Sequence, residues 1–217
     1  MQQKIISTKI TAYVFDEIPD FLTYVYIIFA PKHNFIIDTF CGKDYMTEII
    51  NDISNRNSNE NIIINTHFHW DHIWGNSAFE KSKIVAHKLC SELIEEKWDE
   101  MYEENKEYIL GKLVKVLPNT TFENKLYFPE DNIIIFYSPG HTDDCISVFD
   151  TEEKILFAGD NLEKPQIFIE SPNVNAYIES LKYYIKLNPK KIMAGHTIDL
   201  TINDIKETIK YLECFKS

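Results

Sequence analysis

The N-terminal part of the chain contains short runs of β-branched and aromatic residues bounded by Pro, Asn and Asp. Such runs are typical of β-strands. The runs are "KIISTKITAYVF", "FLTYVYIIFA", "NFIIDTF", "NIIIN" and "KIVAH". A polar stretch that begins at Asn51, "NDISNRNSNENII", separates two of these runs and is interpreted as a loop. The pattern therefore predicts a β-rich N-terminal part.

The spacing of apolar residues changes to a helical period between Lys88 and Leu117. Apolar residues recur there every three or four positions, with acidic residues between them, which indicates an amphipathic helix. The recurring residues are Leu89, Leu93, Ile94, Trp98, Met101 and Tyr102. We expect a helical insertion at about residues 88–117. Its aromatic stripe is interpreted first as packing on the rest of the domain and second as a contact with substrate.

The C-terminal half alternates strand and helix patterns. The strand candidates are "NIIIFYSPGHTDD", "CISVFDTEEKILFAGDN" and "PKKIMAGHT", and the helix candidates are "NAYIESLKYYIKL" and "NDIKETIKYLECF". Three apolar runs end in a glycine that is followed by His141, Asp160 or His196. A strand that stops at glycine lets the next side chain turn over the edge of the sheet, where chemistry is often placed. We expect these three side chains at such an edge.

Length and charge limit the class of protein. The 217 residues, without internal repeats or a linker of low complexity, fit one domain at residues 1–217. A net charge of −12 argues against a nucleic-acid surface, because such surfaces neutralise phosphates with Lys and Arg. The start "MQQKIISTKITAYVF" lacks a secretory signal, and no apolar run is long enough to span a bilayer. We expect a cytoplasmic protein that acts on a small molecule.

The cysteines do not indicate a metal or disulfide framework. The chain has four of them, far apart and without a C-x-x-C pair: Cys41, Cys90, Cys145 and Cys214. We expect free thiols. The histidines are more informative, because "NTHFHWDHIWGN" at residues 65–76 places three of the seven histidines and an aspartate within six positions. Imidazole and carboxylate groups at this density, directly after a strand, predict a metal site.

The motifs "THFHWDH", "SPGHT", "FAGD" and "MAGHT", in this order and over nearly the whole chain, resemble the metallo-β-lactamase-fold hydrolase superfamily. The resemblance implies an α+β fold, a four-layer αβ/βα sandwich with metals at one edge of the sheets. It implies that His67, His69 and His141 hold one ion. Asp71, His72 and His196 would hold a second, and Asp160 would bridge both. The remaining histidines, His33 and His87, match no family position and are interpreted as structural or surface residues.

Departures from the patterns of individual families reduce the number of reactions that the resemblance allows. In β-lactamases with a cysteine ligand the bridging residue is Cys and the residue after the motif aspartate is usually not His, whereas this chain has Asp160 and His72. Di-iron flavoproteins have an acidic ligand at the position of Trp70 and carry a flavodoxin domain. The ligand set is similar to that of glyoxalase II, but only 21 residues follow His196, too few for the helical domain that helps bind glutathione. Trp74 and "IDTFCG" also depart from the usual residues without changing a ligand.

These comparisons favour metal-dependent hydrolysis with two divalent ions. We expect zinc, with iron or manganese as alternatives, because His and Asp suit all three. The ions would present a hydroxide to a thioester, lactone or other ester-like substrate, and Asp71 would orient it or carry a proton. Open alternatives are a phosphodiesterase or nuclease, a β-lactamase-type activity, a mononuclear iron oxidoreductase similar to persulfide dioxygenases, and a metal-binding module without turnover.

Overall fold

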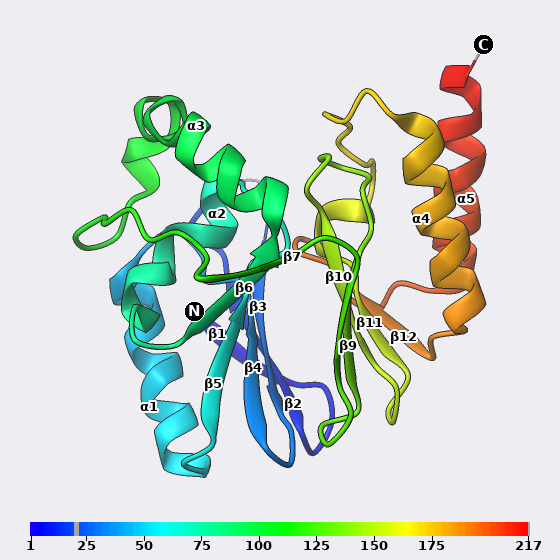
Figure 1. The fold of residues 1–217 in the computed structure, drawn as a ribbon. Helices are drawn as coiled ribbons and strands as arrows, with labels where there is room; N and C mark the ends of the chain where they lie inside the picture. Colours follow the sequence, from blue (N-terminus) through cyan, green and yellow to red (C-terminus); the bar gives the residue numbers. More distant parts are fainter. Residues whose placement is uncertain (20–21, 217) are drawn as a thin grey trace. The chain divides into compact units, whose positions relative to one another are not determined.

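The computed structural model describes residues 1–19 and 22–216. The chain forms two compact units, Met1–Phe122 and Glu123–Ser217, and each contains one β-sheet and its own helices (Figure 1). We call them unit 1 and unit 2. All the site residues expected from the sequence follow strands of these two sheets or lie in the first helix turn after a strand.

Unit 1 has a seven-stranded sheet whose strands are ordered as in the sequence. They are β1 (Gln2–Ile5), β2 (Ile10–Phe15), β3 (Thr23–Phe29), β4 (His33–Ile37), β5 (Glu60–Ile64), β6 (Lys83–His87) and β7 (Thr120–Phe122). The first four strands pair antiparallel, and β4 to β7 pair parallel. Parallel pairing brings the carboxyl ends of β4 and β5 to one edge of the sheet. The segments that follow these two strands therefore start side by side.

Helix α1 (Met46–Arg56) corrects one expectation. The sequence predicts a loop for the polar stretch from Asn51, but the first six residues of this stretch continue the helix. The reason is that Met46, Ile49 and Ile53, spaced by three and four residues, form one buried face of the helix and pack into the core with β2 to β5. The polar residues between them are on the opposite face, and only residues 57–59 connect α1 to β5.

The helical insertion is shorter than predicted. Helix α3 spans Lys88–Asn105 and a single 3₁₀ turn, η3, continues to Tyr108, whereas residues 109–117 are not helical. Ile109 has an extended backbone (φ −69°, ψ 125°), which ends the helical geometry, and the Leu110 amide donates to the Cys41 carbonyl. Ile94 and Trp98 of α3 pack with Ile73 and Trp74 in a separate apolar cluster of unit 1.

The remaining helices of unit 1 are short. Helix α2 comprises Trp70–Ile73, and two 3₁₀ turns, η1 and η2, comprise Lys43–Tyr45 and Trp74–Phe79. Five residues separate the end of β5 from the start of α2, so the histidine cluster is part loop and part first helical turn.

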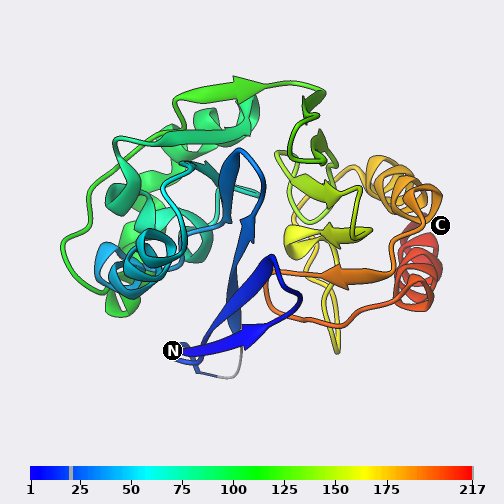
Figure 2. The ribbon, with the colours of Figure 1, turned by 90° about the horizontal axis from the view of Figure 1, so that it is seen from below.

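Unit 2 has a five-stranded sheet in the order β12-β11-β10-β9-β8. The strands are β8 (Lys125–Phe128), β9 (Ile133–Tyr137), β10 (Ile146–Asp150), β11 (Ile155–Phe157) and β12 (Lys191–Met193). All pairs are antiparallel except β11 with β12. Helices α4 (Val174–Leu187) and α5 (Ile202–Glu213) lie side by side against one face of this sheet (Figures 1 and 2). Two 3₁₀ turns, η4 (Gly159–Asn161) and η5 (Cys214–Lys216), complete the unit.

Most predicted elements are confirmed, and two strands were missed. β7 and β8 have three and four residues, and polar residues interrupt their apolar pattern. Within residues 1–19 and 22–216, no helix has the length and apolar character needed to cross a bilayer.

Candidate metal centre

In unit 1, His67, His69, Asp71 and His72 are brought to the carboxyl edge of the sheet. Strand β5 ends at Ile64, and the chain then turns through Thr66 and His67 into α2, which carries Asp71 and His72. The ligating atoms of His67 and His69 lie within 4.8 Å of each other. Nε2 of His72 lies 3.4 Å from Oδ2 of Asp71. Two ligands about 2.0–2.1 Å from one tetrahedral zinc lie about 3.4 Å apart, so this pair has the spacing of two ligands on one ion.

A buried carboxylate, Asp38, organises these histidines from behind. Asp38 follows β4, and its Oδ2 lies 2.9 Å from Nδ1 of His72. The hydroxyl and backbone N–H of Thr66 donate to the two oxygens of Asp38 at 2.8 Å each. Because the Thr66 hydroxyl donates to Asp38, its oxygen is left to accept from Nδ1 of His67 at 3.1 Å. One carboxylate therefore orients His72 directly and His67 through a hydroxyl.

Burial raises the pKa of Asp38, while His72 and the Thr66 donors act in the opposite direction. A wholly buried carboxylate is costly unless donors or positive charge compensate it. The three donors that converge on Asp38 supply part of that compensation, and a cation beside His72 would supply more.

The loop after the histidines is fixed by close backbone contacts. The backbone N–H of Thr39 donates to the His72 carbonyl at 2.8 Å, and the N–H of Gly75 donates to the Phe40 carbonyl at 3.0 Å. A Cβ atom at Gly75 would overlap the Thr39 carbonyl, so only glycine allows this approach. The unusual Trp74 beside it is fully buried in the apolar cluster with α3. This departure from the family pattern therefore fills the core of unit 1.

In unit 2, His141, Asp160 and His196 come from three separate loops, after β9, β11 and β12. Oδ2 of Asp160 lies 3.1 Å from Nε2 of His196 and 3.9 Å from Nε2 of His141. One carboxylate oxygen thus faces two imidazoles. All three residues predicted from the Gly-His and Gly-Asp pattern meet at one place in unit 2.

His141 is held at three atoms. Its N–H donates to Oδ1 of Asn161 at 2.8 Å, and its carbonyl accepts from the backbone N–H groups of Glu170 and Ser171 at 2.9 and 3.0 Å. Its Nδ1 lies 2.9 Å from the carbonyl oxygen of Phe168. Because a carbonyl can only accept, Nδ1 of His141 carries the proton.

The donor chemistry of both units fits a divalent metal. Nδ1 of His67, His72 and His141 each faces an oxygen that accepts a hydrogen bond, so Nε2 is the atom that would bind a metal. Metal-binding histidines are commonly oriented in this way by a carboxylate, a hydroxyl or a carbonyl. Imidazole nitrogen together with Asp oxygen suits zinc, iron and manganese.

Sequence reasoning missed the orienting groups Asp38, Thr66 and Phe168. A signal for Asp38 existed, because "IDT" ends the strand that precedes β5 and parallel neighbours place their carboxyl ends together. Phe168 gave no signal, since its contribution is a backbone carbonyl. The histidines outside the motif are placed as expected. His87 is buried and caps α3 by accepting from the Leu89 N–H at 3.2 Å, and His33 is half-buried at the start of β4.

The four cysteines are free thiols, as predicted. Cys41, Cys90 and Cys145 are buried and Cys214 is exposed. Burial raises the pKa of the Cys41 and Cys145 thiols well above the usual value, so both are held in the neutral form at neutral pH.

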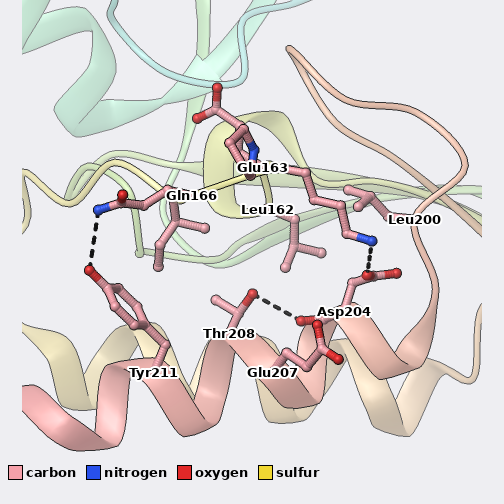
Figure 3. Close-up of a pocket in the computed structure, with 11 residues that line it drawn as sticks. Leu162, Glu163, Gln166, Leu200, Asp204, Glu207, Thr208 and Tyr211 are labelled. Carbon is pink, nitrogen blue, oxygen red and sulfur yellow. Dashed lines mark hydrogen bonds and ion pairs between the residues drawn. The ribbon is translucent and has the colours of Figure 1, made fainter.

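A separate hollow of about 400 Å³ in unit 2 lies between α5 and the segment 162–167. Figure 3 shows the side chains of α5 turned toward this segment, with the Gln166 amide donating to the Tyr211 hydroxyl at 3.3 Å. Lys164 of the segment pairs with Asp204 of α5. None of the predicted ligands lines this hollow. It is therefore distinct from the ligand loops.

Known proteins are similar to this chain in sequence and in fold. A "Beta-lactamase-like protein 2 homolog" of Caenorhabditis elegans is 26% identical over 87% of this chain, which spans 61% of that relative's length. A "Probable metallo-hydrolase" of Methanocaldococcus jannaschii is 29% identical over 74% of this chain and 70% of its own. The solved structure of TMB-1 superposes with a TM-score of 0.81 over 100% of this chain and 98% of its own, at 16% identity.

The fold of that structure confirms the predicted metallo-β-lactamase fold and its α+β class. The family model described as "Metallo-beta-lactamase superfamily" matches residues 18–196, which include every predicted ligand. This chain therefore belongs to the metallo-beta-lactamase superfamily.

Proposed function

We propose that the protein is a single-domain hydrolase that binds two divalent metal ions, most of them zinc. His67, His69 and His141 would bind the first ion. Asp71, His72 and His196 would bind the second, and Asp160 would bridge both. The match to the superfamily over residues 18–196 supports a metallo-hydrolase, and the paired ligands within each unit support the assignment.

One observation carries the proposal. Oδ2 of Asp160 lies within 3.1 Å of His196 and 3.9 Å of His141, residues assigned to different ions. A carboxylate is suited to a shared position, because its oxygens can coordinate two cations and its charge reduces their repulsion. The same spacing also occurs among ligands of one ion, so the assignment of Asp160 to both ions rests on the resemblance to the superfamily, and the number of bound ions tests it.

When bound, the two ions would lower the pKa of a shared water toward about 7 and polarise the carbonyl oxygen under attack. The protein's own contribution is to position and to move protons. Asp71 is 5% exposed and adjoins His72, so its carboxylate can orient the water and pass a proton to the leaving group. The Asp38–Thr66 pair keeps Nε2 of His67 and His72 directed to the site throughout.

The substrate class is a thioester, a lactone or another acyl ester with an apolar part. Phe168 supports this choice, because its side chain is 67% exposed and its ring centroid lies 6.5 Å from that of His141. An exposed aromatic ring beside a ligand offers apolar surface to a substrate group that loses water on binding. The acidic chain favours small substrates over nucleic acid. The cytoplasmic location stays a prediction.

Elemental analysis of protein purified without chelator tests the proposal, together with a screen of thioesters, lactones, phosphodiesters and cephalosporins. We expect about two metal ions per chain, mostly zinc, and the highest kcat/KM on an acyl ester or thioester. A stoichiometry near one ion with full activity would contradict the dinuclear centre. A single iron with oxygen uptake on a persulfide would instead identify an oxidoreductase.

A further inference from the structure

The residue after the proposed bridging ligand, Asn161, is buried at 0% exposure and uses its whole amide. Its Oδ1 accepts from the His141 N–H at 2.8 Å. Its Nδ2 donates to the Ser138 carbonyl at 2.6 Å and to the Tyr184 hydroxyl at 2.8 Å. The acceptor and both donor hydrogens of one side chain are therefore engaged, which only an amide can do in this geometry.

These contacts connect the loops of two proposed ligands. Ser138 and His141 lie on the loop after β9, while Asn161 lies in the turn after β11 that carries Asp160. The side chain of Asn161 bonds to the loop after β9 at two residues, Ser138 and His141. Because Asn161 is next to Asp160 in the chain, a movement of either loop would also move the other. The distance between His141 and Asp160 is thus set through this amide.

Helix α4 holds Asn161 in place from the side. Tyr177 and Tyr184 are seven residues apart and so share one face of the helix. The Tyr177 hydroxyl donates to the Asn161 carbonyl at 2.8 Å, and the Tyr184 hydroxyl accepts from the Asn161 side chain and lies 2.6 Å from Ser147 Oγ. Burial raises the pKa of Tyr184 to about 12, so this hydroxyl keeps its proton at neutral pH.

The packing around this amide leaves no room for another arrangement. A Cβ atom at Gly140 would overlap both Oδ1 of Asn161 and the ring of Tyr177. The glycine before His141 therefore permits the approach of the Asn161 amide.

We infer that Asn161 is a positioning residue for metal binding, which locks the loops of His141 and Asp160 together through its side-chain amide. The inference rests on the proposed function, because it assumes that these two residues bind ions. Asn161 would not bind an ion itself, because its side chain bonds to the backbone of Ser138 and His141. Its loss should change how well the ions are held more than whether the chain folds.

The test measures Zn²⁺ affinity by competition with a chromophoric chelator, and the visible spectrum of the protein reconstituted with Co²⁺. Asn161→Ala should lower the affinity for at least one ion by about tenfold to a hundredfold, the usual cost of losing a group that orients ligands. The Co²⁺ spectrum should change as the ligand geometry relaxes. Tyr177→Phe, which removes only the hydroxyl on the Asn161 carbonyl, should give a smaller loss of the same sign.

The matched control is Asn34→Ala in unit 1. Asn34 is also 0% exposed, and its side chain bonds to Asn57 and Asn61, but it lies near the start of β4, at the end of that strand opposite Asp38. This variant should lower the melting temperature and leave Zn²⁺ affinity and the Co²⁺ spectrum as in the wild type. Equal loss of affinity in Asn34→Ala would overturn the inference, because affinity would then follow general stability.

The other outcomes are also decisive. Unchanged affinity and spectrum in Asn161→Ala would overturn the inference while leaving the proposed function intact. If Asn161→Ala does not fold, Tyr177→Phe decides, and wild-type affinity in that variant would overturn the inference. A wild-type protein that takes up no ion would overturn the proposed function and the inference with it.

Discussion

The two units hold their proposed ligands in different ways. In unit 1, four ligands fall within the six residues from His67 to His72, and a single carboxylate, Asp38, orients two of them through direct and relayed hydrogen bonds. In unit 2, three ligands come from three loops, and neutral groups, the Asn161 amide and the Phe168 carbonyl, hold His141. Unit 1 thus positions its proposed ligands with a charged group, and unit 2 positions His141 with neutral groups.

A carboxylate behind a histidine does more than orient it. It raises the basicity of the imidazole and adds negative charge near the ion, whereas a carbonyl or amide contributes mainly orientation. Unit 1 therefore has charge compensation beyond its proposed ligands, while in unit 2 the negative charge at the proposed site comes from Asp160 itself. The two units should respond differently when one negative charge is removed from each.

The largest effect is expected from removing the charge of the proposed bridge in unit 2. Asp160→Asn keeps the size of the side chain but leaves two dications with less compensation. We expect the loss of most of one metal equivalent and at least about a hundredfold in turnover, comparable to removing a major electrostatic contribution. Metal analysis and kcat/KM measure both, and circular dichroism should report a folded protein, because β11 does not depend on this side chain.

The control for this variant is His87→Ala in unit 1. His87 caps α3, so its loss should lower the free energy of unfolding by about 1 kcal/mol, as the loss of helix caps does. Both ions should remain bound. Two ions and normal turnover in Asp160→Asn, with one ion lost in His87→Ala, would show that the sites are wrongly assigned.

A smaller effect is expected from removing the charge behind the histidines of unit 1. Asp38→Asn leaves every ligand in place, but an amide in the pocket of Asp38 turns at least one N–H toward groups that themselves donate. We expect metal affinity to fall by about tenfold to a hundredfold, as for other groups that orient ligands. Chelator competition measures it, and affinity equal to the wild type would show that His72 and His67 are held well enough without Asp38.

A still smaller effect, on KM, is expected from the exposed aromatic residue next to the proposed ligands of unit 2. Phe68 of unit 1 packs in the apolar cluster with α3, whereas Phe168 of unit 2 is exposed. Phe168→Ala should raise KM for esters with a large apolar group by about tenfold, as the loss of apolar contact in a binding site does, with little change in kcat. An acetyl ester serves as the matched substrate, and an equal rise of KM on both would mean that Phe168 does not contact the acyl group.

The same difference between the units explains what could be predicted from sequence. The proposed ligands of unit 1 form a local motif, so the residues from His67 to His72 predict a metal site without further information. His141, Asp160 and His196 are separate in the sequence, and each follows glycine in a way that is common in ordinary turns. Only their combination with the first motif, and the resemblance to the superfamily, indicated their role.

The groups that position the ligands were missed because their roles depend on contacts between elements that are separate in the sequence. Asp38 depends on the parallel pairing of β4 with β5, and Asn161 depends on the packing of α4 against two loops. Neither contact produces a periodic pattern or a characteristic residue spacing in the sequence. The same holds for the helical insertion predicted to reach Leu117, because the backbone becomes extended at Ile109.

The smallest effect is expected at the last helix of unit 2, away from the ligands. Asp204 of α5 pairs with Lys164 and accepts from the N–H and hydroxyl of Thr201 at 2.7 Å each. Burial alone would raise the pKa of Asp204, but these donors outweigh it and lower the pKa below 3.8.

A carboxyl with a lowered pKa stabilises the folded state above its unfolded pKa, and this contribution is lost as pH falls through the lower, folded value. Asp204→Asn should therefore reduce the free energy of unfolding at pH 7 by about 1 kcal/mol or less, since Lys164 is exposed to solvent. The difference from the wild type should shrink toward zero below pH 3.8. Denaturant titrations across pH measure it, with metal content at pH 7 as the second readout. A loss of metal in Asp204→Asn would show that α5 is coupled to the ligand loops, and that unit 2 depends on its periphery in a way that unit 1 does not.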